Sequence, residues 1–349
     1  MQGSAAYKRS PAFCHGDMSL ELPAASDIWN ARSPAEWRTR LLSRTQSQRG
    51  TPLTLIDIVR DPALLPCADS AYDSKLGALA AVQGMWIQVA SYLDSRAIFH
   101  PHSSPMRRGP SLLWLEAQRQ DLYQILQDMK KTFTRLHVLT AEAWMICEFS
   151  MMSLYASSAD IQTFVGRFGQ SESQATQPRL QLWLRSDEHR YAVWHAGQVL
   201  RAGASFNVSR LNGFYAIMVY EASLTLLTVS ILPKCTELPS QSVFWHLEAE
   251  SDPSAPLSTQ AEGEYLRPFS QCVVTVNSAE CRDTDEYLSK GTGSPALQIK
   301  GNTRLLSDVE PISSAMTCLF EQNHRPTAGA LPPLLEELAT LLKALSQTV

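Results

Sequence analysis

The sequence predicts an all-α protein built as an irregular array of many helices. Apolar residues recur at steps of three and four in several long segments, which is the spacing of one helix face. No set of alternating apolar and polar residues is large enough to predict a sheet. The 349 residues are 44% hydrophobic and 18% charged, so the chain can bury one large core or two modest ones.

The strongest helical signal is a predicted hairpin of two helices, Tyr191–Phe206 and Arg210–Leu224. Gly203 follows the last periodic position of the first helix, and we expect it to cap that helix. Asn207-Val-Ser209 also fits a glycosylation sequon, but we interpret it as a helix start. We expect the large side chains of the hairpin to pack in the core, with room for a small-molecule pocket between helices. These side chains are Trp194, Phe214, Tyr215 and Met218.

The chain divides into an N-terminal arm, residues 1–70, and a helical domain, residues 71–349. The arm is expected to dock onto the core through short apolar groups. Its clearest element begins at Ser33-Pro-Ala-Glu36, where serine can cap, proline suits the first turn and glutamate can complete a capping box. The other segments are interpreted as follows: helices at about 75–93, 112–136, 139–155 and 334–345, a turn or short linker at 166–178, and an exposed, partly mobile loop at 233–268.

Charge and apolar patterning exclude some classes of protein. A net charge of -4 and a pI near 6.1 argue against the whole chain acting as a basic clamp for nucleic acid. The longest apolar candidate, Ala216 to Leu232, is interrupted by Glu221 and several hydroxyl groups, so we expect no membrane span. Seven widely spaced cysteines favour reduced thiols inside the cell.

The sequence shows no metal site. Zinc needs four converging ligands, and the chain has neither a CxxC nor a histidine pair that matches one. Arg107-Arg108 and Lys130-Lys131 are interpreted as solvated surface pairs. The remaining metal-capable groups are interpreted as loop residues, thiols or packed histidines: Cys14-His15, His100 and His102, Cys272 with Cys281, and His189 and His195.

The sequence also lacks an enzyme signature. It has no nucleophile elbow, no phosphate-binding loop and no dinucleotide-binding fingerprint. Asp283-Thr-Asp285-Glu286 comes nearest to the aspartate cluster of a magnesium-dependent helical cyclase, but we interpret it as a solvated helix start. We therefore expect no enzyme activity, no cofactor, and no catalytic, cofactor-binding or metal-binding residue.

The predicted hairpin carries His195-Ala-Gly-Gln198 followed by Phe214-Tyr215. This pair resembles two helices in the C-terminal half of the fungal-specific transcription factor domain found with C2H2 zinc fingers, and further short blocks of the sequence resemble other parts of that domain in order. The order and rough spacing agree over about residues 12 to 345. The other blocks are Leu20-Glu-Leu-Pro23 with Asp27-Ile-Trp29, Ser33-Pro-Ala-Glu-Trp37, Gly291-Thr-Gly-Ser-Pro-Ala-Leu297 and Leu331-Pro-Pro-Leu-Leu335.

The resemblance implies a helical regulatory domain of a nuclear transcription factor, and such factors often control biosynthetic genes of secondary metabolism. Because no finger motif occurs in the sequence, DNA binding would come from a missing finger region or a partner protein. The expected partners are the transcription machinery or a DNA-binding protein, with a homodimer as one possibility. Two alternatives stay open: a helical enzyme of specialised metabolism, and an interaction scaffold that uses the amphipathic helix at 112–136.

Overall fold

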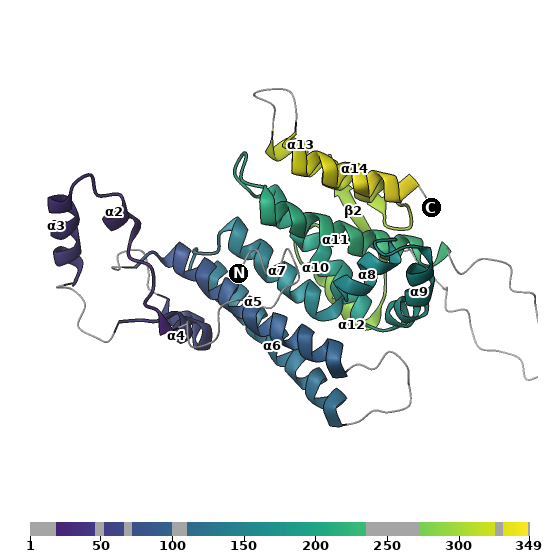
Figure 1. The fold of residues 1–349 in the computed structure, drawn as a ribbon, viewed down its shortest axis with the longest axis horizontal. Helices are drawn as coiled ribbons and strands as arrows, with labels where there is room; N and C mark the ends of the chain where they lie inside the picture. Colours follow the sequence, from purple (N-terminus) through teal and green to yellow (C-terminus); the bar gives the residue numbers. More distant parts are fainter. Residues whose placement is uncertain are drawn as a thin grey trace, which may run out of the picture.

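Two helices with apolar residues on nearly every face form the centre of the molecule. α7 (Ala141–Tyr155) buries twelve of its fifteen residues, and α11 (Gly213–Ile231) buries thirteen of nineteen. A helix of this kind needs neighbours on all sides. In this computed structural model α10 (Glu188–Ala204) packs against both of them, and most of the longer helices pack around these three (Figure 1).

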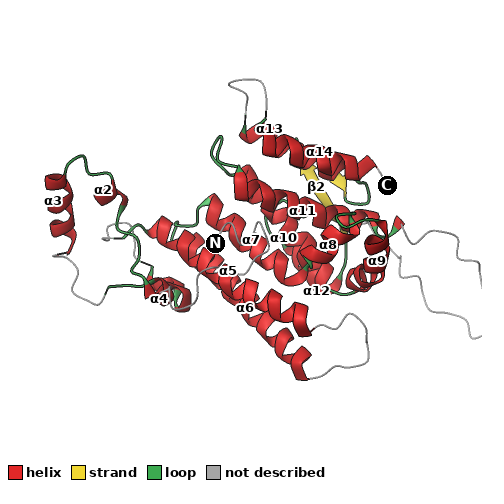
Figure 2. Cartoon of the chain, viewed as in Figure 1, coloured by secondary structure: helices red, strands yellow, loops and turns green. Residues whose placement is uncertain are grey.

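The described part of the chain is mostly helical, as predicted, with thirteen α-helices and one short 3₁₀ helix (Figure 2). The structure describes residues 19–45, 52–65, 72–99, 110–234, 272–324 and 331–347. The remaining helices are α2 (Ser26–Trp29), α3 (Pro34–Thr45), α4 (Leu55–Arg60), η2 (Pro62–Leu64), α5 (Ser74–Phe99), α6 (Pro110–Arg135), α8 (Ser158–Phe164), α9 (Gln170–Arg185), α12 (Arg282–Lys290), α13 (Glu310–Asn323) and α14 (Pro333–Gln347).

The long predicted helices are confirmed. The prediction at 75–93 lies in α5, that at 112–136 matches α6 except for its last residue, that at 139–155 matches α7 except for its first two residues, and the leucine-rich segment after Pro333 is α14. The apolar stripe of α6 faces α5 and α7 and is buried, so it is not available to an external partner. The buried members of this stripe are Leu115, Leu122, Leu126, Met129 and Phe133.

The predicted helical hairpin is α10 and α11, but both ends of its connection differ from the prediction. Gly203 does not cap α10, because the helix continues to Ala204 and Ser205 follows it. A Cβ atom at Gly203 would lie 2.9 Å from Leu319 Cδ2, so glycine there leaves room for this side chain of α13. The residue that precedes α11 is Asn212, and Asn207-Val-Ser209 lies in the loop before it.

The predicted linker at 166–178 is largely wrong. Only residues 166–169 form a turn, and Gly166 and Gly169 both have positive φ there. α9 begins at Gln170 and passes through Pro178. Its inner face buries Thr176 and Leu180, and this packing outweighs the missing N–H of the proline.

A small sheet is present, which corrects the expectation that there is none. β1 (Val273–Thr275) pairs in parallel with β2 (Ser294–Ile299), which pairs antiparallel with β3 (Asn302–Leu305). α12 is the crossover that a parallel pair requires. The strands are short and β3 is exposed along its whole length, so no alternation of apolar and polar residues identifies them in the sequence.

The described part of the arm is held to the core by a few residues. Glu21 and Thr54 form an antiparallel bridge, and Leu22 is buried over Gly77 of α5. The predicted helix at Ser33 is α3, where the Ser33 hydroxyl accepts a hydrogen bond from the Glu36 N–H. α2 and α3 lie at one end of the molecule, away from the central helices (Figure 1). Most of the predicted loop at 233–268 lies outside the described residues.

Two described helices, α5 and α11, are long and apolar enough to cross a membrane by length and composition alone. More than half of the most apolar segment of each is buried inside the fold. The core helix of a soluble protein has the same composition, so this observation is weak evidence for a membrane span.

We predict that Leu22→Ala loosens the arm while Leu20→Ala does not. Leu22 is buried, whereas Leu20 is 69% exposed. Truncating a buried leucine costs about 2 kcal/mol or more, which would make amide exchange at Leu22 and Leu55 about thirtyfold faster. Hydrogen exchange measured by mass spectrometry tests this. Equal exchange in the two variants would show that Leu22 does not hold the arm.

Candidate functional site

A buried carboxylate joins three helices at the centre of the fold. The Glu148 side chain on α7 is 0% exposed. Its Oε1 atom accepts hydrogen bonds from the Trp144 indole at 2.9 Å and from Lys130 of α6 at 2.8 Å. Its Oε2 atom lies 2.7 Å from Nδ1 of His195 on α10. Each carboxylate oxygen is therefore paired, as a buried charge requires.

Lys130 is part of this centre, which corrects its interpretation as a surface residue. Its side chain is 16% exposed and also reaches Glu280 at 3.2 Å, just before α12. Burial by itself would lower the pKa of Lys130, but the charges of Glu148 and Glu280 and their hydrogen bonds raise it. Lys130 therefore stays charged. Its neighbour Lys131 is exposed, as predicted.

His195 is a packed histidine, as one of the predicted roles has it. Its Nδ1 lies 2.7 Å from the Glu148 carboxylate, and its Nε2 lies 3.2 Å from the Tyr123 hydroxyl. Tyr123 in turn accepts a hydrogen bond from the Gln127 amide at 3.0 Å. Burial raises the pKa of Tyr123, so this hydroxyl keeps its proton and can donate. Because the His195 side chain is also 0% exposed, the centre is closed to a substrate in this conformation.

Glu148 has a pKa well below its usual value. Burial would raise the pKa, but the charge of Lys130 and the hydrogen bond and charge of His195 together outweigh burial. A carboxyl with a lowered pKa stabilises the fold above the pKa it has in the unfolded chain, and this contribution is lost as the pH falls through the folded value. The centre therefore stabilises the protein at neutral pH and fails in acid.

A second charged group lies on the same helices. Arg119 of α6 pairs with Glu188 of α10 and, at 2.6 Å, with Glu116. Its guanidinium also lies 4.9 Å from the centre of the Tyr155 ring, at the C-terminus of α7. The ring of Tyr155 stacks on that of Tyr191, with centroids 4.8 Å apart. These contacts add further links between α6, α7 and α10.

The His-Ala-Gly-Gln segment also joins α10 to the loop that follows β1. The Gln198 amide donates to the carbonyl oxygens of Val276 and Ser278, both at 2.8 Å. A Cβ atom at Gly197 would lie only 2.4 Å from the Val276 oxygen, so only glycine permits this approach. Arg201, one turn further on, donates to Ser278 at 3.1 Å.

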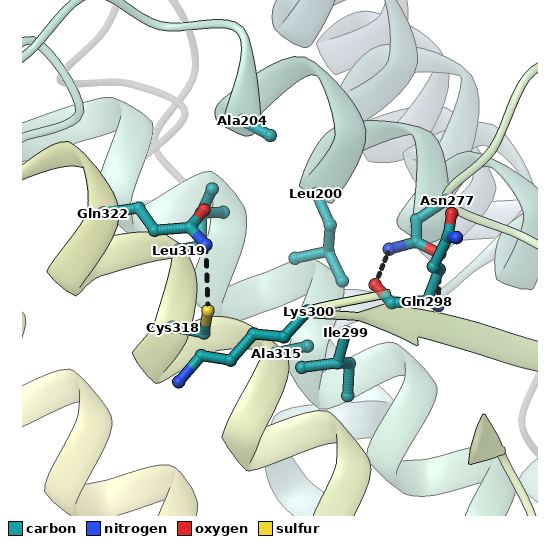
Figure 3. Close-up of a pocket in the computed structure, with 10 residues that line it drawn as sticks. All are labelled: Leu200, Ala204, Asn277, Gln298, Ile299, Lys300, Ala315, Cys318, Leu319 and Gln322. Atoms are coloured by element: carbon teal, nitrogen blue, oxygen red, sulfur yellow. Dashed lines mark hydrogen bonds between the residues drawn. The ribbon is translucent and has the colours of Figure 1, made fainter. Parts of the chain in front are cut away.

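A small cleft of about 90 Å³ lies beside this junction, between α10, α13 and the turn from β2 to β3 (Figure 3). Lys300, which has positive φ in that turn, lies along it, and Gln322 donates to Cys318 Sγ at 3.2 Å. Sites for drug-sized ligands usually exceed about 300 Å³. The cleft has room for only a few ligand atoms, and its lining does not include Trp194, Phe214, Tyr215 or Met218.

The predicted core residues of the hairpin are only partly enclosed. Trp194 and Met218 are buried, whereas Phe214 and Tyr215 are half-buried. Asp283-Thr-Asp285-Glu286 opens α12, and both aspartates are exposed, so the interpretation as a solvated helix start is confirmed.

Among the described residues, the histidines and cysteines that the sequence singled out are not gathered into one site. His189 is half-buried on α10 and contacts the Ser186 carbonyl at 2.6 Å, away from the Glu148 centre. Cys272 and Cys281 are exposed free thiols. Within the described residues, no three His, Cys, Asp or Glu side chains gather in a way that could hold a metal ion. Cys14-His15, Arg107-Arg108, His100 and His102 lie outside the described residues.

The partners of His195 were missed in the sequence. Glu148 offered one signal, because it is the only charged residue in the segment Ala143–Tyr155, and an unpaired charge does not stay in such a helix. Nothing in the sequence pairs it with Lys130 or Tyr123 of α6. These pairings depend on how far one helix is shifted along the other. The spacing of apolar residues within one helix gives no information about that shift.

Comparison with known proteins gave no match among protein-family models, curated proteins or solved structures.

We predict that Glu148→Gln lowers the free energy of unfolding by roughly 3 to 5 kcal/mol at pH 7, because it leaves Lys130 without its buried counter-charge and His195 without its carboxylate partner. The deficit should shrink as the pH falls from 4.5 towards about 2, where the native carboxyl gains its proton. Urea denaturation at several pH values measures both effects.

The matched control for this prediction is Glu280→Gln, which removes the other partner of Lys130. The Glu280 side chain is 57% exposed, so we expect a loss of about 1 kcal/mol or less. Equal losses in the two variants would contradict the central role of Glu148.

We predict that Gly197→Ala destabilises the fold by about 1 to 3 kcal/mol, because the new methyl group meets the Val276 backbone. Gly77→Ala is the matched control, since its Cβ would meet only the ends of two side chains, Leu65 at 3.1 Å and Leu22 at 3.6 Å. There the gain in helix propensity offsets the tighter contact. Thermal unfolding compares the two, and equal melting temperatures would show that the loop can move away from α10.

Proposed function

We propose that this chain is a transcription-regulatory domain of the fungal type that acts by binding partner proteins. Its sequence resemblance to that family supports the proposal, and the resembling residues have defined structural roles. Gly197 and Gln198 hold α10 to the loop after β1, and Gly291 ends α12 in a left-handed conformation. Residues with such roles are those that a shared fold would retain.

The observation that carries the proposed protein binding is a group of exposed apolar side chains on α2 and α3. Trp29 is 72% exposed, Trp37 is 45% exposed and Leu42 is 53% exposed. Arg32 and Arg38 lie exposed in the same segment. We call these five residues the tryptophan surface. Tryptophan and arginine are the residue types most enriched where protein interfaces derive their affinity.

The tryptophan surface is also held in place before any partner binds. The Trp29 indole donates a hydrogen bond to the Ala24 carbonyl at 3.0 Å, which fixes the direction of its ring. Arg40 of α3 contacts both the Asp27 carbonyl and Glu36, so it links α3 to α2. A fixed surface loses less conformational entropy on binding than a flexible one.

The proposed occupant is a partner protein that presents an apolar segment with acidic residues. Apolar side chains would cover the two indole rings, and carboxylates would pair with Arg32 and Arg38. In this proposal the partner connects the domain to DNA or to the transcription machinery in the nucleus. The proposal assigns no catalytic role to the Glu148 centre.

We predict that the double variant Trp29→Ala/Trp37→Ala reproduces the transcript profile of a gene deletion in the native host. Removing both indoles would take away the main apolar contacts with the partner, while the buried core stays intact. RNA sequencing of the variant, the deletion and the unmodified strain gives the comparison, with immunoblotting to confirm equal protein levels.

The matched control is Phe168→Ala/Leu182→Ala, which removes two side chains with exposures of 60% and 65%. Leu182 is part of α9 and Phe168 lies just before it, and α9 is at the opposite end of the molecule from α2 and α3 (Figure 1). It should leave transcripts unchanged. A deletion without a coherent transcript change would overturn the regulatory function. If the deletion changes the transcripts coherently but the tryptophan variant does not, the regulatory function would stand. The tryptophan surface would then not be the site that binds the partner.

A further inference from the structure

The last strand of the small sheet is an open edge. β3 has β2 on one side, and all four of its residues are exposed. Along an edge strand, every second backbone N–H and C=O points away from the sheet and can pair with another strand. Folded proteins usually cover or block such an edge, so an uncovered one is a candidate surface for binding.

The register of the hairpin identifies which residues of β3 bond to β2. The turn has two residues, Lys300 and Gly301, and both have positive φ. In a two-residue hairpin the residues that flank the turn, here Ile299 and Asn302, exchange hydrogen bonds. Bonded and non-bonded pairs then alternate along the two strands. Asn302 and every second residue after it therefore face β2.

The residues between these point their backbone groups outward. The Leu306 N–H donates to the Pro295 carbonyl at 2.9 Å, which continues the alternation beyond β3. Thr303 and Leu305 therefore face away from β2. Within the described part of the chain, their outward groups have one contact, a long hydrogen bond of 3.5 Å from the Asp308 N–H to the Leu305 carbonyl. The N–H and C=O of Thr303 and the N–H of Leu305 remain available.

The open edge also carries positive charge. The hairpin from Ser294 to Leu305 contains Lys300 and Arg304 and no acidic residue, although the whole chain has a net charge of -4. Both basic side chains are exposed, and neither forms a salt bridge with any residue that the structure describes. Unpaired charge and unpaired backbone groups therefore lie on the same strand.

The position of Arg304 argues against a second copy of β3 as the occupant. Two copies related by a two-fold axis would use the outward groups if Thr303 of each chain paired with Leu305 of the other. That register places the two Arg304 side chains directly opposite each other. Like charges in this position destabilise a strand pair. The edge is therefore better suited to a partner of opposite charge.

We propose that the edge of β3 binds an extended acidic segment of another protein, which joins the sheet as an additional antiparallel strand. Thr303 and Leu305 exchange backbone hydrogen bonds with two residues of the segment. Arg304 lies opposite the residue between those two, where a carboxylate pairs with its guanidinium group.

This geometry defines the kind of segment that fits. Side chains alternate between the two faces of a strand, so acidic residues at every second position all lie on the face that carries Arg304. Apolar β-branched residues at the other positions favour the extended conformation. The surface is distinct from the tryptophan surface of α2 and α3, and this inference does not depend on the function proposed above.

The probe is a fluorescent peptide of four Val-Glu repeats with both ends blocked, titrated with the full-length protein and followed by fluorescence anisotropy. We expect saturable binding that weakens as salt is added. A peptide of four Val-Lys repeats has the same strand propensity pattern and the opposite charge, and it should bind roughly tenfold more weakly or less well still.

N-methylation of the peptide tests the backbone pairing. If glutamate lies opposite Arg304, the valine N–H groups face β3 and the glutamate N–H groups face away. Methylation of every valine nitrogen should therefore abolish binding, whereas methylation of every glutamate nitrogen should change the affinity by about twofold or less. Binding through charge alone would not distinguish the two peptides.

Two changes in the protein test the same contacts. Thr303→Pro removes an outward N–H without removing a bond to β2, and it should weaken binding of the Val-Glu peptide about tenfold. Thr303→Val is the matched control, because it keeps the N–H and should bind normally. Arg304→Glu should reverse the preference, so that the Val-Lys peptide binds more tightly. Circular dichroism confirms that each variant is folded.

Four outcomes would overturn the proposal. The first is that the Val-Glu peptide shows no saturable binding. The second is that methylation of valine and of glutamate nitrogens has equal effects. The third is that Arg304→Glu leaves the preference between the two peptides unchanged. The fourth is that sedimentation shows a dimer of the full-length protein that Thr303→Pro dissociates, because a second copy would then occupy the edge.

Discussion

The fold depends on the enclosure of a single carboxylate. Glu148 is surrounded by apolar side chains of α7, where an isolated charge would cost several kcal/mol. Lys130 and His195 pair with its two oxygens, so α6 and α10 cannot shift along α7 without leaving a charge unpaired. Apolar packing tolerates small shifts more readily than this geometry does. The polar centre therefore sets the register of the three helices, and apolar burial supplies most of the stability.

The helices could be predicted from the sequence where one face repeats at helical spacing, and this held for α5, α6, α7, α10 and α11. The spacing of apolar residues did not identify elements whose burial does not follow a single apolar face. α9 shows too little apolar periodicity and contains a proline, so it resembled a linker. β1 and β3 have three and four residues, and the exposure of β3 leaves no alternation to detect. α9 and the small sheet both depend on contacts with residues that are distant in the sequence.

The candidate sites could be predicted less well than the fold. The packed role of His195 followed from its place in an apolar helix, but its partners lie 47 and 72 residues away along the chain. Gly203 illustrates the same limit at the level of the backbone. A glycine near a helix end usually caps the helix, whereas here it admits the side chain of Leu319 from α13. A local pattern cannot distinguish these two uses of glycine.

The junction between α10 and the loop after β1 has a consequence for how such sequences diverge. Gly197 and Gln198 each meet backbone atoms of the loop, and backbone atoms are the same whatever residues the loop carries. Replacement of either residue therefore cannot be compensated by a single change in the loop, whereas exposed residues of α2 and α3 can drift independently. Over long divergence the recognisable signature would remain at the junction. Similarity at the junction would then indicate that two proteins share the fold by common descent. It would not indicate that they bind the same partners, because the surfaces that select partners can change independently.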